Sequence, residues 1–288
     1  MSNGAHPAKD NSRNRAVTKL AVGAVIVVAV LFVVAAVAAV ALNGGGTHNS
    51  TPSGAPSTAS PPQTPGSKTP ATAESEGGAW DVTAEAALAR RPMVVFSVEA
   101  SQPHTLSPRT AGAPIPLPAS MIRTSLVAQG FPRTPEGALA QLKALDETGM
   151  QGLDPAAYDL AWQELALPGA PASSGVGLVR AASAARSTGR LDPTGPVDGL
   201  ISTYQVDAGL IKGTADDGNF VVPCVLGELS VITTNAARRA GVGDCQAMRW
   251  VGGRWRISPT ALPSAAACGW PGTEEAVIAG YRAVVSGA

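Results

Sequence analysis

The feature that most constrains this chain is an apolar run at residues 20–42, which contains no charged residue, amide or proline. At about 1.5 Å of rise per residue, a helix of this length spans roughly 35 Å and can cross a hydrocarbon core of about 30 Å. The run is apolar on all sides, and it exceeds the apolar region of about 7 to 15 residues of a secretory signal peptide. We expect one transmembrane helix, with cleavage of a signal near residues 39–41 as the alternative.

The charges around this run predict its orientation. Lys9, Arg13, Arg15 and Lys19 precede it, and the next cation is Lys68. Because Lys and Arg favour the cytoplasmic side, we expect a single-pass protein of the cell membrane with its N-terminus inside. The whole chain has 21 cationic and 21 anionic residues, so it lacks the basic field that direct nucleic-acid binding requires.

Composition divides the rest of the chain into segments. Residues 1–19 are polar and lack apolar periodicity, which predicts a disordered cytoplasmic tail. In the segment 43–78, 25 of 36 residues are Gly, Ser, Thr or Pro, which is typical of a flexible linker. Residues 79–118 are rich in proline and are expected to form an arm on the surface or against a partner. The segment 119–288 is long enough for one extracytoplasmic domain.

Three helices are predicted at the start of this domain. Thr134 can cap the first helix, Pro135 suits its first position, and Gly149 ends it. A second helix is expected from about 155 to 165 and a third from about 176 to 188. In the arm, we expect residues 84–91 to be helical or extended.

Strand-like runs follow the helices. Residues 197–211 and 220–234 are predicted to form a hairpin around a turn at 213–218, and residues 245–251 and 254–258 form a second one. A final helix is expected from Thr273. In the arm, the apolar run at 93–96 is a candidate strand, and the prolines after it argue against regular structure up to residue 118. This order predicts an α+β fold of three helices packed on a curved antiparallel sheet.

Catalytic chemistry has little support in the sequence. His104 is the single histidine after the linker, and a lone loop histidine is typical of a structural residue. Asp216 and Asp217 suit a solvated turn, and Glu274 and Glu275 suit the first turn of a helix. The tryptophans are interpreted as core residues in preference to a carbohydrate-stacking surface. We predict no catalytic, cofactor-binding or metal-binding residues, and no enzyme.

Three cysteines lie beyond the apolar run, where oxidation is allowed on the outer side of the membrane. Cys224 and Cys245 fall in consecutive predicted strands, so a disulfide between them is the first expectation. Pairing of Cys245 with Cys268 is the alternative.

The assembled layout resembles a known class of membrane proteins. It combines a short tail, one spanning helix, a tether, and helices followed by a meander that ends in the sequence Trp250-Val-Gly-Gly-Arg-Trp255. This layout is similar to single-pass subunits of conjugation or type IV secretion systems with a nuclear-transport-factor-2-like outer domain, and to membrane proteins of actinobacterial conjugative elements. The resemblance implies a non-catalytic scaffold that docks other transfer-apparatus proteins or forms a homo-oligomer.

A second class of function remains open. Domains with this cone-like fold often enclose a pocket, so the chain is alternatively a membrane-tethered small-molecule-binding protein or enzyme. Tyr204, Asp207 and Trp250 are the candidate pocket residues. A pocket protein should bury convergent polar groups inside the cone, whereas a docking subunit should expose an apolar surface.

Overall fold

The computed structural model describes residues 80–234, 236–259 and 262–287. The segments expected to form the tail, the transmembrane helix and the linker, at 1–19, 20–42 and 43–78, lie outside these residues. Among the helices of the described part, none has both the length and the apolar character needed to cross a membrane.

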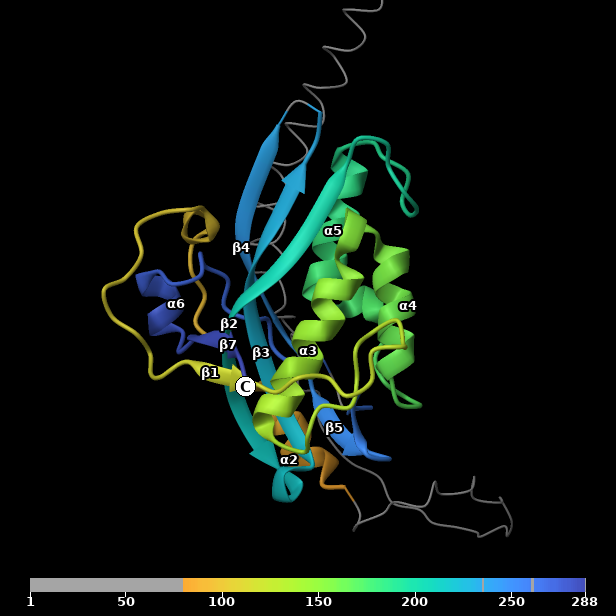
Figure 1. Ribbon diagram of the computed structural model, residues 1–288, viewed down its shortest axis with the longest axis vertical. Helices are drawn as coiled ribbons and strands as arrows, with labels where there is room; N and C mark the ends of the chain where they lie inside the picture. Colours follow the sequence, from red (N-terminus) through yellow and green to blue (C-terminus); the bar gives the residue numbers. More distant parts are fainter. Residues whose placement is uncertain (1–79, 235, 260–261, 288) are drawn as a thin grey trace, which may run out of the picture.

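Three consecutive helices form one layer of the domain, as the sequence predicts (Figure 1). The first helix begins at the predicted residue, because the hydroxyl of Thr134 accepts a hydrogen bond from the Gly137 N–H at 3.0 Å. Asp154 caps the second helix in the same way by accepting from the Ala156 N–H at 3.0 Å. The helices are α3 (Pro135–Gly149), α4 (Pro155–Leu165) and α5 (Gly177–Thr188).

Seven strands form one curled sheet in the order β1-β7-β2-β3-β5-β6, with β4 also paired to β3. Register shifts after Val206 and after Ile211 interrupt the long β2–β3 hairpin, and such bulges increase the local twist of a sheet. The α+β class is confirmed, but the sheet is mixed, because β1 pairs with β7 in parallel. The strands are β1 (Ile115–Leu117), β2 (Ile201–Ala215), β3 (Phe220–Ile232), β4 (Ala237–Cys245), β5 (Met248–Val251), β6 (Arg254–Ile257) and β7 (Arg282–Ser286).

Both faces of this sheet are covered. The larger core lies between the helices and one face, where Leu142 and Leu145 of α3 pack with Val225 and Trp255 of the sheet, all of them fully buried. A smaller core covers the opposite face, where Leu226 packs with residues of the arm and of the C-terminal segment. The arm therefore belongs to the folded domain.

The arm contains more regular structure than the sequence predicts. It begins with α2 (Val82–Arg90), continues through a short 3₁₀ helix, η1 (Val98–Ser101), and ends in strand β1. Residues 93–96 are not a strand, and the strand lies instead inside the proline-rich stretch, where Pro116 is its middle residue. Proline is tolerated there because β1 is the edge strand of the sheet.

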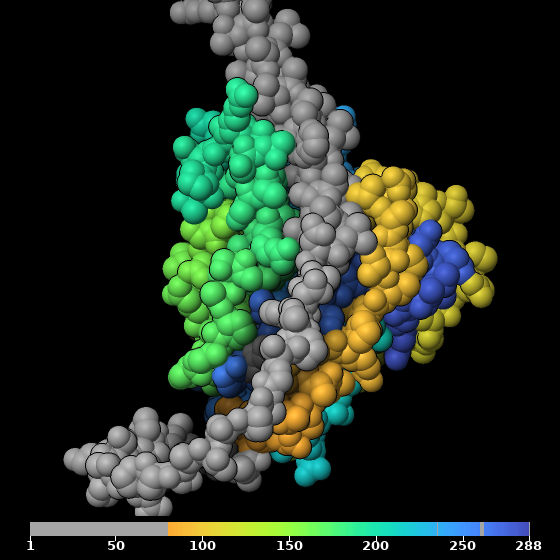
Figure 2. Space-filling view, turned by 180° about the vertical axis from the view of Figure 1, so that it is seen from behind, coloured from red at the N-terminus to blue at the C-terminus, as the bar shows by residue number. Residues whose placement is uncertain are grey.

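The C-terminal segment lies beside the arm, as Figure 2 shows in blue and orange. Backbone hydrogen bonds join the two, including Trp270 N–H to Ala100 O at 2.6 Å and Ser264 N–H to Ala89 O at 3.0 Å. The expected final helix is present as α6 (Glu274–Ile278), a single short turn after Thr273. Strand β7, which inserts between β1 and β2, is not predicted from the sequence.

A buried ion pair fastens α2 to the sheet. Arg249 of β5 pairs with Glu85 of α2, and both residues are 1% exposed. The same guanidinium donates to Asp216 at 2.7 Å and lies 4.2 Å from the centre of the Trp80 ring. Asp216 lies in a hairpin turn as predicted, but there it is the partner of a buried arginine.

Candidate functional site

Two buried carboxyl groups lie on the helix side of the sheet. Asp146 of α3 is completely buried and accepts a hydrogen bond from the Tyr158 hydroxyl of α4 at 2.7 Å. Burial, and secondly the charge of Asp244, raise the pKa of Asp146 well above its usual range. Burial thus favours the neutral form of Asp146.

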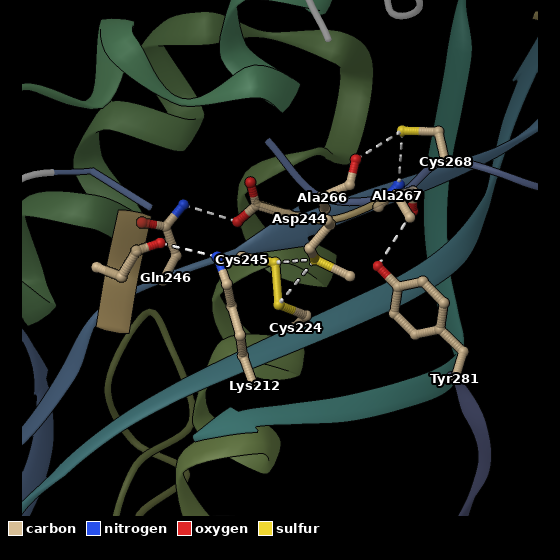
Figure 3. Close-up of a disulfide and its surroundings, with 12 residues drawn as sticks. Lys212, Cys224, Asp244, Cys245, Gln246, Ala266, Ala267, Cys268 and Tyr281 are labelled. Atoms are coloured by element: carbon tan, nitrogen blue, oxygen red, sulfur yellow. Dashed lines mark hydrogen bonds between the residues drawn. A yellow bond between two sulfur atoms is a disulfide. The ribbon is translucent and has the colours of Figure 1, made fainter. Parts of the chain in front are cut away.

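The second carboxyl group, Asp244, lies near the end of β4 beside Gln246. The Gln246 amide donates a hydrogen bond to Asp244 Oδ2 at 2.7 Å, as Figure 3 shows. Burial raises the pKa of Asp244 to about 7, although the hydrogen bonds from Gln246 and from the Cys245 backbone favour the ionised form. A carboxyl group with a pKa near 7 can both accept and donate a proton at neutral pH.

A cavity of about 290 Å³ opens next to this second acid. Asp244 and Gln246 line it together with Ser264, Cys268 and Arg180, whose side chain is exposed. The Oε1 atom of Gln246 is buried and has no hydrogen-bond partner among the described residues. The cavity therefore combines a carboxyl group, a free acceptor and a cation, which suits a polar ligand.

Neither of these two acids is predicted from the sequence as a site residue. Asp146 lies four residues after Leu142, at the spacing of the apolar stripe of α3, and this position was the available signal. Asp244 is two residues after Val242, so strand alternation places both on the same face of β4.

The structure places the three predicted pocket residues apart. Tyr204 is buried and donates its hydroxyl hydrogen bond to Val242 O at 2.7 Å. Asp207 lines a different hollow of about 490 Å³ beside α3, where burial raises its pKa. Trp250 is half-buried and packs edge-on against Trp255, with 5.4 Å between ring centres.

The cysteines pair as first predicted. Cys224 and Cys245 lie opposite each other on β3 and β4 and form a disulfide (Figure 3). The Met93 sulfur lies 3.5 Å from the Cys245 sulfur and 3.8 Å from that of Cys224, so the arm covers the bond. Cys268 is a free thiol whose pKa is raised by burial, and the alternative pairing with Cys245 is not formed.

The remaining candidates join the arm to the C-terminal segment. His104 contacts Glu275 at 3.1 Å and the carbonyl oxygen of Gln102 at 2.7 Å. The hydrogen bond to Gln102 and, secondly, Glu275 raise the pKa of His104. Glu274, in the first turn of α6 as predicted, pairs with Arg109 of the arm.

An ordered loop before α3 exposes apolar side chains. Met121 is 79%, Ile122 41% and Leu126 58% exposed, and we call these three residues the apolar loop.

The backbone of this loop is held by a β-bridge between Ile122 and Gln129 and by hydrogen bonds that the Ser120 hydroxyl donates. Glu164 of α4 holds it as well, accepting from the Val127 N–H and from the Gln129 amide, both at 2.9 Å. The loop is thus rigid although its side chains face solvent.

These features define an α+β domain with a curled sheet, a polar cavity on its helix side and an apolar loop. Comparison of the chain with protein-family models, with curated proteins and with solved structures found no match. The described residues contain no group of three His, Cys, Asp or Glu side chains that is arranged to hold a metal ion.

Proposed function

We propose that this chain is a membrane-anchored, non-catalytic subunit that docks other proteins of a conjugation or type IV secretion-like transfer apparatus outside the membrane. The apolar run and its flanking charges support the anchored topology. The layer of three helices on a curled sheet is compatible with a nuclear-transport-factor-2-like cone. The partner is another subunit of the apparatus, with an apolar face that fits the loop, or a second copy of the chain.

The rigid apolar loop carries this proposal. Large apolar side chains that are exposed to water do not stabilise the isolated domain, and a group of them on the surface marks an interaction site. Hydrogen bonds that Ser120 donates and that Glu164 accepts already fix the backbone, so little ordering entropy remains to be lost when a partner binds. The loop is therefore preorganised for contact through Met121 and Leu126.

Site-specific crosslinking tests the docking role. A photo-crosslinking residue at position 126 of the full chain, in membranes of its own host, should give products that mass spectrometry identifies as transfer-apparatus proteins or a second copy. The same residue at exposed position 188 on α5 is the matched control and should not give these products. Equal products at both positions, or none at position 126, would contradict the proposal.

The cavity beside Asp244 favours a second candidate, a membrane-tethered small-molecule-binding protein or enzyme. Asp244 and Gln246 are buried polar groups that line this cavity, as expected of a pocket protein, and the charge of Asp244 also acts on the buried Asp146. Screening polar small molecules by thermal shift should reveal ligands that stabilise the native chain but not the Asp244→Asn variant. Asp198→Asn, at an exposed position, is the control and should keep the response. A screen in which no compound distinguishes these two variants would count against this candidate.

A further inference from the structure

A second cavity of about 290 Å³ lies on the face of the sheet opposite α3, α4 and α5. It is lined by the end of α2, the middle of β2 and the end of α6. Two cations, Arg91 and Lys212, line it, and every other lining residue is apolar. Met93, Leu210 and Ile278 are among these apolar residues. The cavity therefore combines positive charge with hydrophobic walls.

Lys212 is unusually buried for a lysine. The residue is only 7% exposed, and its ammonium group donates one hydrogen bond, to Ala89 O at 2.8 Å. An ammonium group has three donors, so two of them have no partner among the described residues. Figure 3 shows this side chain extending from β2 beside the disulfide.

No carboxylate of the described residues forms an ion pair with Lys212 or with Arg91. Burial and, secondly, the positive charge of Arg91 lower the pKa of Lys212 to about 8. Arg91 is exposed, whereas Lys212 is buried, and a buried charge is normally paired with an opposite charge. A bound anion would supply the missing counter-charge.

The backbone keeps both cations close to the cavity. Gly213 follows Lys212 on β2, and a Cβ atom at Gly213 would lie 3.3 Å from the Arg91 guanidinium and 2.5 Å from Leu88. Glycine at this position therefore allows the arginine to lie over the strand next to Lys212. The guanidinium offers a planar pair of donors that matches a carboxylate.

We propose that this cavity binds a carboxylate carried on a short apolar group, with Lys212 and Arg91 holding the carboxylate and the hydrophobic walls holding the apolar group. A carboxylate fits better than a phosphate, because no other side chain that lines the cavity offers a hydrogen-bond donor to additional anionic oxygens. The site uses no residue of the apolar loop and none of the cavity at Asp244. It adds a ligand-binding function to either proposed role.

Calorimetric titration of the full chain in mild detergent tests the site, with hexanoate as the probe at pH 7. Hexan-1-ol has the same apolar chain without the charge, and inorganic phosphate has charge without the chain. We expect hexanoate to bind at least tenfold more tightly than either. Tighter binding of phosphate would overturn the assignment to carboxylates, and equal binding of hexanol would overturn the role of the cations.

Variants locate the binding. Arg91→Ala and Lys212→Met should each weaken hexanoate binding at least tenfold, whereas Arg90→Ala, at the exposed neighbouring position, should leave it unchanged. Raising the pH to 9.5 should weaken binding to the native chain, because Lys212 loses its proton, and it provides a test that requires no substitution. Unchanged binding in Lys212→Met and at pH 9.5 would refute the proposal.

Discussion

Replacing Glu85 by glutamine is expected to lower the free energy of unfolding by about 3 kcal/mol. Removing one partner of a buried ion pair typically costs about 3 to 5 kcal/mol, because the other charge stays in a dry environment. Arg249 is 1% exposed, but it keeps Asp216 at 2.7 Å, a residue whose side chain is 35% exposed. This remaining partner places the expected loss at the lower end of the range.

The surface provides a matched control for this prediction. Glu228 and Arg239 also form an ion pair between two elements, but their side chains are 24% and 56% exposed. Glu228→Gln should therefore cost at most about 1 kcal/mol. The double variant Glu85→Leu with Arg249→Met removes both charges and should recover most of the loss, since apolar replacement of a whole buried pair is often nearly neutral.

Urea unfolding of the full chain in mild detergent, followed by tryptophan fluorescence, measures these differences. A second readout is the protection of the α2 amides from hydrogen exchange, which should fall in Glu85→Gln because the ion pair holds this helix on the sheet. A loss in Glu85→Gln no larger than in Glu228→Gln would refute the reasoning, and so would a double variant as unstable as the single one.

Three further predictions concern other buried groups. Replacing Cys224 and Cys245 by alanine should lower the free energy of unfolding by about 3 kcal/mol, since the disulfide closes a loop of 21 residues. Thiol titration of the native chain, unfolded without reductant, should find one free thiol. The pKa of Lys212 is about 8 in the fold and 10.5 ordinarily, so the unfolded state binds more protons between these values. The free energy of unfolding should then rise by about 3 kcal/mol from pH 8 to pH 10.5, and denaturation of Lys212→Met should lack this rise. The buried Arg186 guanidinium donates to the carbonyl oxygens of residues 152, 153, 192 and 195. Arg186→Met should therefore lower the free energy of unfolding, measured in urea, by about 3 kcal/mol or more. Arg180→Met, at an exposed position, is the control and should be nearly neutral.

Local signals explain which parts of the fold were predictable. The capping residues Thr134 and Asp154 and the prolines that follow them act within one turn, so the helix starts are visible in the sequence. Strand β4 contains two arginines and two glycines and has no run of strand-forming residues. Its Gly241 is required by a tertiary contact, since a Cβ atom there would lie 1.9 Å from Gly269 O. No local pattern indicates such a contact.

The candidate sites depend on the same kind of tertiary information. Tyr204 and Asp207 are three residues apart on β2, and the bulge after Val206 interrupts the alternation of faces between them, so their relative placement could not be read from the local sequence. Asp146 resembles an ordinary polar residue of a helix until α3 is packed against the sheet beside Asp244. The cavity of Lys212 joins α2, β2 and α6, which are distant in sequence.

The attachment of α2 also determines how the domain responds to mechanical force. The described chain begins at Trp80, whose ring lies against the Arg249 guanidinium, and Glu85 pairs with the same group. Tension that reaches the domain from its N-terminal side is therefore applied first to this contact. Under such a load, α2 would separate from the sheet before the β2–β3 hairpin opens, so α2 and the residues that follow it would act as an extensible element on the N-terminal side of the domain.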